Sequence, residues 1–265
     1  MYRSVIQEPS KIITGALRCF LLLTSTVFWL PMNNAMAGEI RVLSAGAVEP
    51  GIVKVIDVFR RKTGHDVKIN FATAPAITKR AGAGETVDIV IAPLAVLDEW
   101  VKAGKAAQAE RVTIGSIGVG VMVRAGAPLP KIGTVDEFKK SLLSAESLVY
   151  NQASTGIYLE GLFETMGIAA QLKPNTTRYP DAAAVLSHVS KGNGNEIGLG
   201  ATTVIIEGES IGLKFVGPLP EDIQNYTTYA AILAAEGTGL GAAREFVSYL
   251  TTPAAKKIFA AAGIK

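Results

Sequence analysis

The chain has 265 residues, of which 49% are hydrophobic and 7% aromatic, and its 26 basic and 23 acidic residues leave a formal charge of +3. Lysine and arginine are scattered rather than gathered into a basic stripe with interleaved aromatic residues, which argues against a nucleic-acid-binding protein. A chain of this length suits one large domain or two small lobes.

Residues 1–37 have the features of a secretory signal peptide. Three basic residues precede an apolar run that ends near Met32, and the sequence NAMAG then offers a cleavage site at Ala37. The apolar run is shorter than the roughly 20 residues of a comfortable transmembrane helix, so we favour a cleaved signal over a permanent anchor. We therefore expect a periplasmic protein whose mature chain begins near Gly38.

Removal of this segment changes what the composition implies. The single cysteine, Cys19, lies within it, together with three basic residues and one acidic residue, so the remaining chain is nearly balanced in charge and has no thiol. The two histidines, His65 and His188, are isolated in the sequence and are read as structural residues. We expect no metal site and no cofactor.

The sequence after Gly38 alternates strand-like and helix-like segments. EIRVLSA (39–45) reads as a strand, and PGIVKVIDVFRRKTG (50–64) has apolar residues at helical spacing with Gly64 as a suitable C-cap. The same order continues with strands at 66–73 and 87–93 and helices at 75–85 and 94–106. This regular alternation predicts a parallel sheet with helices on both faces.

The second half begins with a strand of a different kind. IGSIGVGVMVRAGAP (114–128) is rich in glycine and has no amphipathic face, as expected for a segment that crosses between lobes. Thr134 and Glu137 then form a capping-box pattern. The further expected elements are helices at 134–145, 156–168 and 181–194, strands at 147–152, 196–205 (running into a turn) and 225–235, and two helices within 239–264 that are broken at Pro253.

Two α/β lobes joined by two extended crossings imply a hinged binding architecture. We assign residues 38–121 plus 227–265 to lobe 1 and residues 122–226 to lobe 2. GESIG (208–212) matches the G-x-S-x-G sequence of a nucleophile elbow, but a strand rather than the required helix follows Ser210. We therefore read GESIG as a turn. In such sheets, ligands lie beyond the carboxyl ends of the strands and beside helix N-termini.

Four predicted strand-to-helix turns are rich in small and hydroxyl residues: SAGAVEP, ATAPAIT, NQASTGIY and GATTV. Each could be no more than a helix N-cap, but four such turns at one sheet edge predict an anion-binding site, because free backbone N–H groups and the helix dipole point at the ligand. The candidate residues in these turns are Ser44, Gly46, Thr73, Ser154, Thr155, Gly156, Thr202 and Thr203.

The stretch from Arg41 to Pro93, with GIYLEGLFETMGI and AREFVSYLTTPAAKKIFAAAGI, resembles the molybdate-binding proteins of ABC transporters, which are type II periplasmic binding proteins. The resemblance covers essentially the whole chain after the signal peptide. It implies a two-lobed α/β fold with a hinge of two crossing strands, in which lobe 1 is split between the start and the end of the sequence. It also implies a small-molecule anion as ligand and an ABC permease as partner. We expect a monomer.

At the positions of the family's molybdate ligands, this sequence has different residues. The family's two hydroxyl ligands fall at Ala47 and Ala74, a strand-end alanine falls at Pro93, and a pocket tyrosine falls near Ala201. Each lost charge-assisted hydrogen bond is worth about 1.5–3 kcal/mol, so we expect poor molybdate binding. A pocket enlarged in this way favours a small carboxylate, bound as the solute of an ABC transporter receptor.

The segments LSAGAV and VRAGAP also resemble aconitate isomerases, exported enzymes on the same fold, which leaves a second function open. An allylic proton shift between cis- and trans-aconitate needs a base, and Glu49 is the candidate, although it could equally be a first-turn acid of a helix. Tyr150 and Tyr226 could donate or relay a proton. The cations that could hold carboxylates, unless they are surface charges, are Lys79, Arg80, Arg124 and Arg178.

Overall fold

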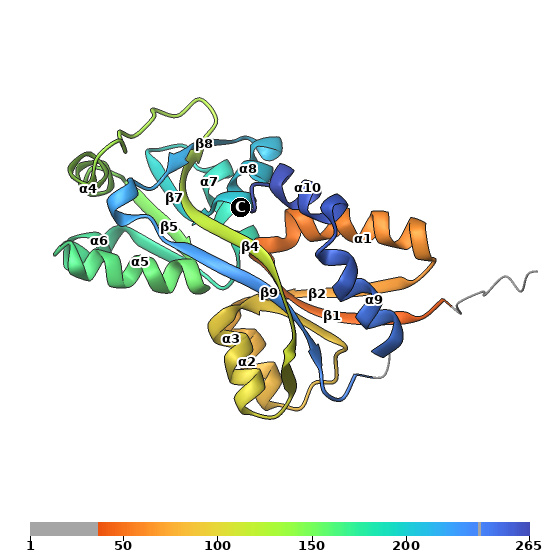
Figure 1. The fold of residues 1–265 in the computed structure, drawn as a ribbon. Helices are drawn as coiled ribbons and strands as arrows, with labels where there is room; N and C mark the ends of the chain where they lie inside the picture. Colours follow the sequence, from red (N-terminus) through yellow and green to blue (C-terminus); the bar gives the residue numbers. More distant parts are fainter. Residues whose placement is uncertain (1–36, 238–239) are drawn as a thin grey trace, which may run out of the picture. The chain divides into compact units, whose positions relative to one another are not determined.

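The computed structural model describes residues 37–237 and 240–265, so the predicted signal peptide up to Met36 lies outside the described residues. The described chain folds around a mixed nine-stranded sheet in the order β2-β1-β3-β9-β4-β7-β5-β6, with β8 paired to β4 (Figure 1). The strands are β1 (Glu39–Ala45), β2 (Asp66–Ala72), β3 (Ile89–Pro93), β4 (Ala106–Arg124), β5 (Ser147–Asn151), β6 (Thr176–Tyr179), β7 (Glu196–Ala201), β8 (Leu213–Pro218) and β9 (Tyr226–Ala234).

Helices connect most of these strands, as the alternating sequence predicts. They are α1 (Glu49–Thr63), α2 (Ala74–Gly82), α3 (Leu94–Lys102), α4 (Val135–Leu143), α5 (Ser154–Thr165), α6 (Ala169–Leu172), α7 (Ala182–Lys191), α8 (Thr202–Gly208), α9 (Leu240–Leu250) and α10 (Pro253–Ala261). Short 3-10 turns are η1 (Gly46–Val48), η2 (Lys173–Asn175), η3 (Glu209–Ile211) and η4 (Glu221–Ile223).

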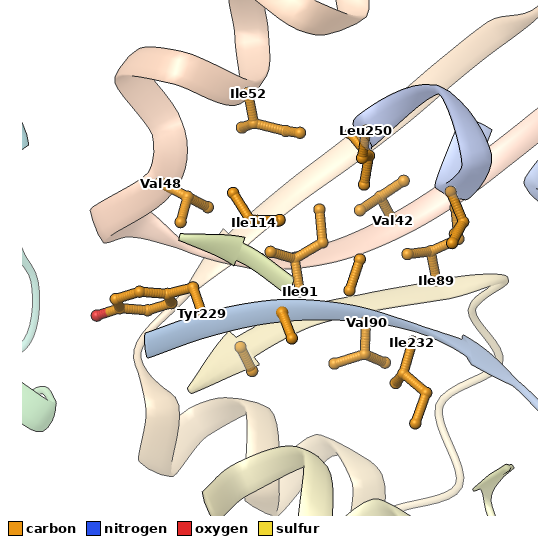
Figure 2. Close-up of a cluster of buried hydrophobic side chains, with 14 of the residues drawn as sticks. Val42, Val48, Ile52, Ile89, Val90, Ile91, Ile114, Tyr229, Ile232 and Leu250 are labelled. Atoms are coloured by element: carbon orange, nitrogen blue, oxygen red, sulfur yellow. The ribbon is translucent and has the colours of Figure 1, made fainter. Parts of the chain in front are cut away.

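The first lobe is built on β1, β2 and β3, which run parallel to one another. The helices α1, α9 and α10 cover one face of this sheet and α2 and α3 cover the other (Figure 1). Its apolar core joins Val42 and Ile91 of the sheet to Ile52 of α1 and Leu250 of α9 (Figure 2). The predicted parallel strands with helices on both faces are therefore present in this lobe.

The second lobe is built on β5, β6 and β7, again parallel, with β4 and β8 added in the antiparallel sense. The helices α7 and α8 lie on one face of this sheet and α5 on the other (Figure 1). Its largest core cluster includes Phe138 of α4, Leu148 of β5 and Leu159 of α5. Each lobe therefore has its own apolar core.

Two long antiparallel strands, β4 and β9, run side by side between the lobes (Figure 1). β4 pairs with β9 as far as Gly118 and, from Val119 onward, pairs with β7. The Gln224 side chain holds this change of partner, accepting from the Val119 N–H at 2.9 Å and donating to the Val119 carbonyl at 3.0 Å. The two predicted crossing strands are thus present, and our lobe boundaries at 121/122 and 226/227 stay a prediction.

Local signals worked well at helix ends and less well inside the second lobe. Gly64 ends α1 in the left-handed conformation (φ 78°), and the Thr134 hydroxyl accepts from the Glu137 N–H at 3.2 Å, both as predicted. The segment GESIG forms a turn, as predicted. Residues 202–205 are wrong as a turn, because α8 begins directly after β7 and continues to Gly208. The short strand β6 was not predicted.

Candidate functional site

A cavity of about 490 Å³ opens between the two lobes, where strands of both sheets end and helices begin. The first lobe lines it with the β1–α1 turn, the end of β2, the start of α2 and the end of β3. The second lobe lines it with the ends of β5 and β7, the first turns of α5 and α7, and one face of α8. This is the position that the sheet topology favours for a ligand.

The wall from the first lobe is made largely of small residues. Gly46, Ala47 and Ala74 line it, with Thr73 directly before α2 and Pro93 at the end of β3. Because Gly46 and the two alanines carry no polar side chain, the polar side chains on this wall are those of Thr73 and Glu49. The wall therefore leaves space where a bulkier hydrogen-bonding residue would reach the ligand.

The opposite wall presents the N-terminus of α5. Ser154 and Thr155 line the cavity in the first turn of this helix, and the Asn151 side chain orders the preceding turn by accepting from the Ala153 N–H at 3.0 Å. The unpaired N–H groups of a helix N-terminus and its dipole favour an anion at this point. Ala201, at the end of β7, also lines this wall and leaves it without a side-chain donor there.

Four of the sequence candidates do not line the cavity: Ser44, Gly156, Thr202 and Thr203. Ser44 is fully enclosed in β1, between β2 and β3, where its hydroxyl donates to the Ala45 carbonyl at 3.3 Å. Gly156 is buried, and a Cβ atom added there would lie 1.7 Å from the Asn151 carbonyl oxygen. Gly156 therefore lets α5 approach β5 closely and acts on the site through backbone position.

Thr203 joins the lobes instead of facing the cavity. Its side chain is 1% exposed, and its hydroxyl donates to the Ala47 carbonyl at 2.7 Å, linking α8 of the second lobe to the β1–α1 turn of the first. This hydrogen bond closes one side of the cavity. The described conformation is thus one in which the two lobes are in contact beside the site.

The side-chain charges at the cavity are negative. Glu49, Asp181 and Glu207 line it, and no described lysine, arginine or histidine does. Asp181 caps α7 by accepting from the Ala184 N–H at 2.9 Å. Burial raises the pKa of the Glu49 carboxyl above its ordinary value of 4.5, and the negative charge of Glu207 raises this pKa further.

The four proposed cations lie elsewhere. Arg80 is paired with Glu85, Arg178 with Glu160 at 2.5 Å, and Arg124 donates to the Ala125 carbonyl at 3.3 Å, while Lys79 is exposed on α2. None of the four lines the cavity, in keeping with the alternative that they are surface charges. Hydrogen-bond donors to an anion in this cavity must therefore come from hydroxyls, the Asn151 amide and helix N-termini.

The two tyrosines named from the sequence also lie away from the cavity. Tyr150 is buried against Phe163, with the Arg178 guanidinium over its ring, and Tyr226 is 51% exposed beside Lys265. A third tyrosine, Tyr229 of β9, lines the cavity and was not predicted. No local sequence signal identifies Tyr229 as a cavity residue, because it lies inside a strand whose position depends on both lobes.

Two other residues that line the cavity, Asp181 and Glu207, were missed because the elements around them were not predicted. Asp181 follows the unpredicted strand β6, so its turn was not recognised as another strand-to-helix turn. Glu207 lies on α8, which was read as a turn.

Across the described ranges, no group of three or more metal-ligating side chains occurs. His65 and His188 contact Glu245 (3.2 Å) and Tyr179 (2.9 Å), respectively, away from the cavity.

Residues 40–265 match the family model described as bacterial extracellular solute-binding protein. The chain belongs to this family. Aconitate isomerase from a Pseudomonas species is 31% identical over 254 residues, a match that spans 92% of this chain and 93% of the relative.

Two solved structures place the fold among periplasmic binding proteins. The periplasmic molybdate-binding protein of Azotobacter vinelandii superposes with a TM-score of 0.73 at 18% identity, covering 85% of this chain and 98% of that one. The sulfate-binding protein of Mycobacterium tuberculosis superposes with a TM-score of 0.67 at 21% identity, covering 86% of each chain. The solute-binding protein described here therefore has the two-lobed α/β fold that its sequence predicts.

The described part of this solute-binding protein contains no helix that is long and apolar enough to cross a membrane. The predicted signal peptide stays a prediction, since its residues up to Met36 lie outside that part.

Proposed function

We propose that this solute-binding protein binds a small organic acid in the cavity between its lobes. The observation that carries the proposal is the cavity itself: at about 490 Å³ it falls within the 300–1,000 Å³ typical of organic ligands, and alanine occupies positions 47, 74 and 201 on its walls. A tetrahedral oxyanion would fill little of this space. The first turn of α5 supplies donors for a carboxylate.

The biological setting proposed for this binding is the periplasm, with delivery of the bound acid to an ABC permease. One similar solved structure is described as the substrate-binding domain of a putative molybdenum ABC transporter from Clostridium difficile. The predicted signal peptide and the family membership support this role.

Ligand binding is tested by thermal unfolding and calorimetry of the purified protein with cis-aconitate, trans-aconitate, citrate, sulfate and molybdate. A ligand that binds only the folded state at 100 times its Kd adds about 2.7 kcal/mol of stability, so an organic acid should raise the Tm in a concentration-dependent way. Molybdate and sulfate should leave the Tm unchanged. Tight molybdate binding without binding of any organic acid would contradict the proposal.

A second candidate function, interconversion of cis- and trans-aconitate, is favoured by Glu49. This carboxyl lines the cavity and has a raised pKa, which makes its ionised form a stronger base than an ordinary glutamate. In the proposed step Glu49 removes a proton from the methylene carbon of aconitate, the double bond shifts toward that carbon, and Glu49 returns the same proton to the CH carbon of the original double bond. The step needs no oxidant, reductant or co-reactant. The full-length relative that is an aconitate isomerase supports this alternative.

Turnover is tested by incubating the protein with trans-aconitate and following cis-aconitate by chromatography. A Glu49→Gln variant should lose about 10²–10⁴-fold of the activity, as expected for loss of a general base, while still binding the acid. Asp57→Asn changes an exposed carboxylate farther along α1 and is the matched control, which should keep full activity. If the wild-type protein binds trans-aconitate but does not convert it, the isomerase alternative is overturned and only the receptor function remains.

A further inference from the structure

Tyr229 is a polar group at the cavity that neither of these functions has used. We propose that its hydroxyl donates a hydrogen bond to the bound organic acid and takes over from the missing side-chain donors at positions 47, 74 and 201. The inference rests on the proposed ligand class and adds a specific binding residue to it.

The backbone of Tyr229 is held where the two lobes meet. Tyr229 lies on β9 opposite Pro93 of β3 on one side and Gly115 of β4 on the other. Both neighbouring strands are thus in register with it, and Pro93 lines the same cavity. The position of the Tyr229 backbone at the cavity is therefore fixed by strand pairing on both sides.

The ring and the hydroxyl of Tyr229 lie in different surroundings. The residue is 3% exposed, and its ring packs at the edge of the apolar cluster beside Val48 (Figure 2). The hydroxyl points away from that cluster (Figure 2). Since Tyr229 also lines the cavity, the hydroxyl is the part of the side chain that can meet a ligand.

No hydrogen bond joins the Tyr229 hydroxyl to another group of the described residues, and this hydroxyl is not among their fully enclosed polar atoms that lack a partner. The hydroxyl is therefore open to the cavity, where a phenol usually finds a hydrogen-bond partner. A ligand carboxylate in the cavity would provide that partner. Burial raises the pKa of Tyr229, so the group stays protonated and acts as a donor.

The experiment compares trans-aconitate binding by the wild-type protein and Tyr229→Phe, using calorimetry at one pH. The substitution keeps the ring in the apolar cluster and removes only the hydroxyl. Affinity should fall about tenfold or more, the loss expected for one hydrogen bond to a charged group, while the Tm of the unliganded protein stays close to that of the wild type. Tyr249→Phe is the matched control, since Tyr249 belongs to the same cluster and does not line the cavity.

The outcomes separate this inference from the proposed function. If the wild-type protein binds trans-aconitate and Tyr229→Phe binds it with the same affinity, the role of Tyr229 is overturned and the proposed ligand class stays intact. Equal losses in Tyr229→Phe and Tyr249→Phe would also overturn it, because the effect would then come from packing. Failure of the wild-type protein to bind any of the organic acids would overturn the proposed function and this inference together.

Discussion

Glu49 is the residue at which the electrostatics of the site are most unusual. It follows the η1 turn on the first lobe and meets the negative charge of Glu207 from the second lobe, in a cavity that no described cation lines. A first-turn acid is normally stabilised by the helix dipole, which lowers its pKa. Here burial and the like charge of Glu207 raise the pKa of Glu49 instead.

This raised pKa predicts how stability depends on pH. The folded protein holds the Glu49 proton to higher pH than the unfolded chain does, so the free energy of unfolding should fall as pH rises from 4.5 through the raised pKa. Glu49→Gln removes this dependence and should gain stability relative to wild type across the same range. Urea denaturation at several pH values between about 4 and 8 measures the difference.

Asp57→Asn serves as the control for this experiment as well, because Asp57 is exposed on the same helix and away from the cavity. The pH profile of Glu49→Gln should differ from that of Asp57→Asn. A Glu49→Gln profile that runs parallel to wild type would show that Glu49 titrates alike in the folded and unfolded states.

At the scale of elements, the N-terminus of α5 depends on the absence of one side chain. Gly156→Ala would place a Cβ atom 1.7 Å from the Asn151 carbonyl oxygen, which can be relieved only by moving the helix away from β5. Overpacking of this kind costs up to about 3 kcal/mol, and it should also weaken ligand binding because Ser154 and Thr155 would move. Chemical denaturation and ligand calorimetry measure the two effects.

Gly161 offers a matched control in the same helix. A Cβ atom added there meets nothing within 4 Å, so Gly161→Ala should leave the fold intact and raise the free energy of unfolding by up to about 1 kcal/mol through helix propensity. If both alanine variants behaved alike, the close approach at Gly156 would not be what positions α5.

At the scale of the whole described chain, the two lobes are joined by the crossing strands β4 and β9 and by the contact of Thr203 with Ala47. The hydrogen bond stabilises this contact between the lobes, whereas repulsion between Glu49 and Glu207 opposes it.

Thr203→Val tests the contact between the lobes. The substitution keeps the shape of the side chain but removes the donor to the Ala47 carbonyl, so the free energy of unfolding should fall by about 1 kcal/mol and ligand affinity should fall with it. Thr203→Ser keeps the hydroxyl and should preserve affinity, measured by calorimetry alongside thermal unfolding. Equal affinity in the valine and serine variants would show that this hydrogen bond does not support the closed state.

Much of the order of strands and helices could be predicted because it follows from local sequence patterns. The alternation that ends with Pro93 follows from hydrophobic periodicity, and the first crossing strand from its glycine-rich, non-amphipathic composition, both of which depend only on near neighbours. The failures fall where that signal is weak. The four residues of β6 and the seven of α8 are too short to show a period, so Asp181 and Glu207 were not recognised as site residues.

By itself, the sequence determined the two-lobed fold, the family, and the turns that carry Thr73, Ser154 and Thr155 to one cavity. Only the tertiary structure decided which other side chains face that cavity: it enclosed Ser44, turned Thr203 toward the opposite lobe, and brought Tyr229 to the cavity. The reason is physical. Secondary structure follows from periodicity along the chain, whereas the direction of a side chain at a lobe boundary depends on how separate segments pack together.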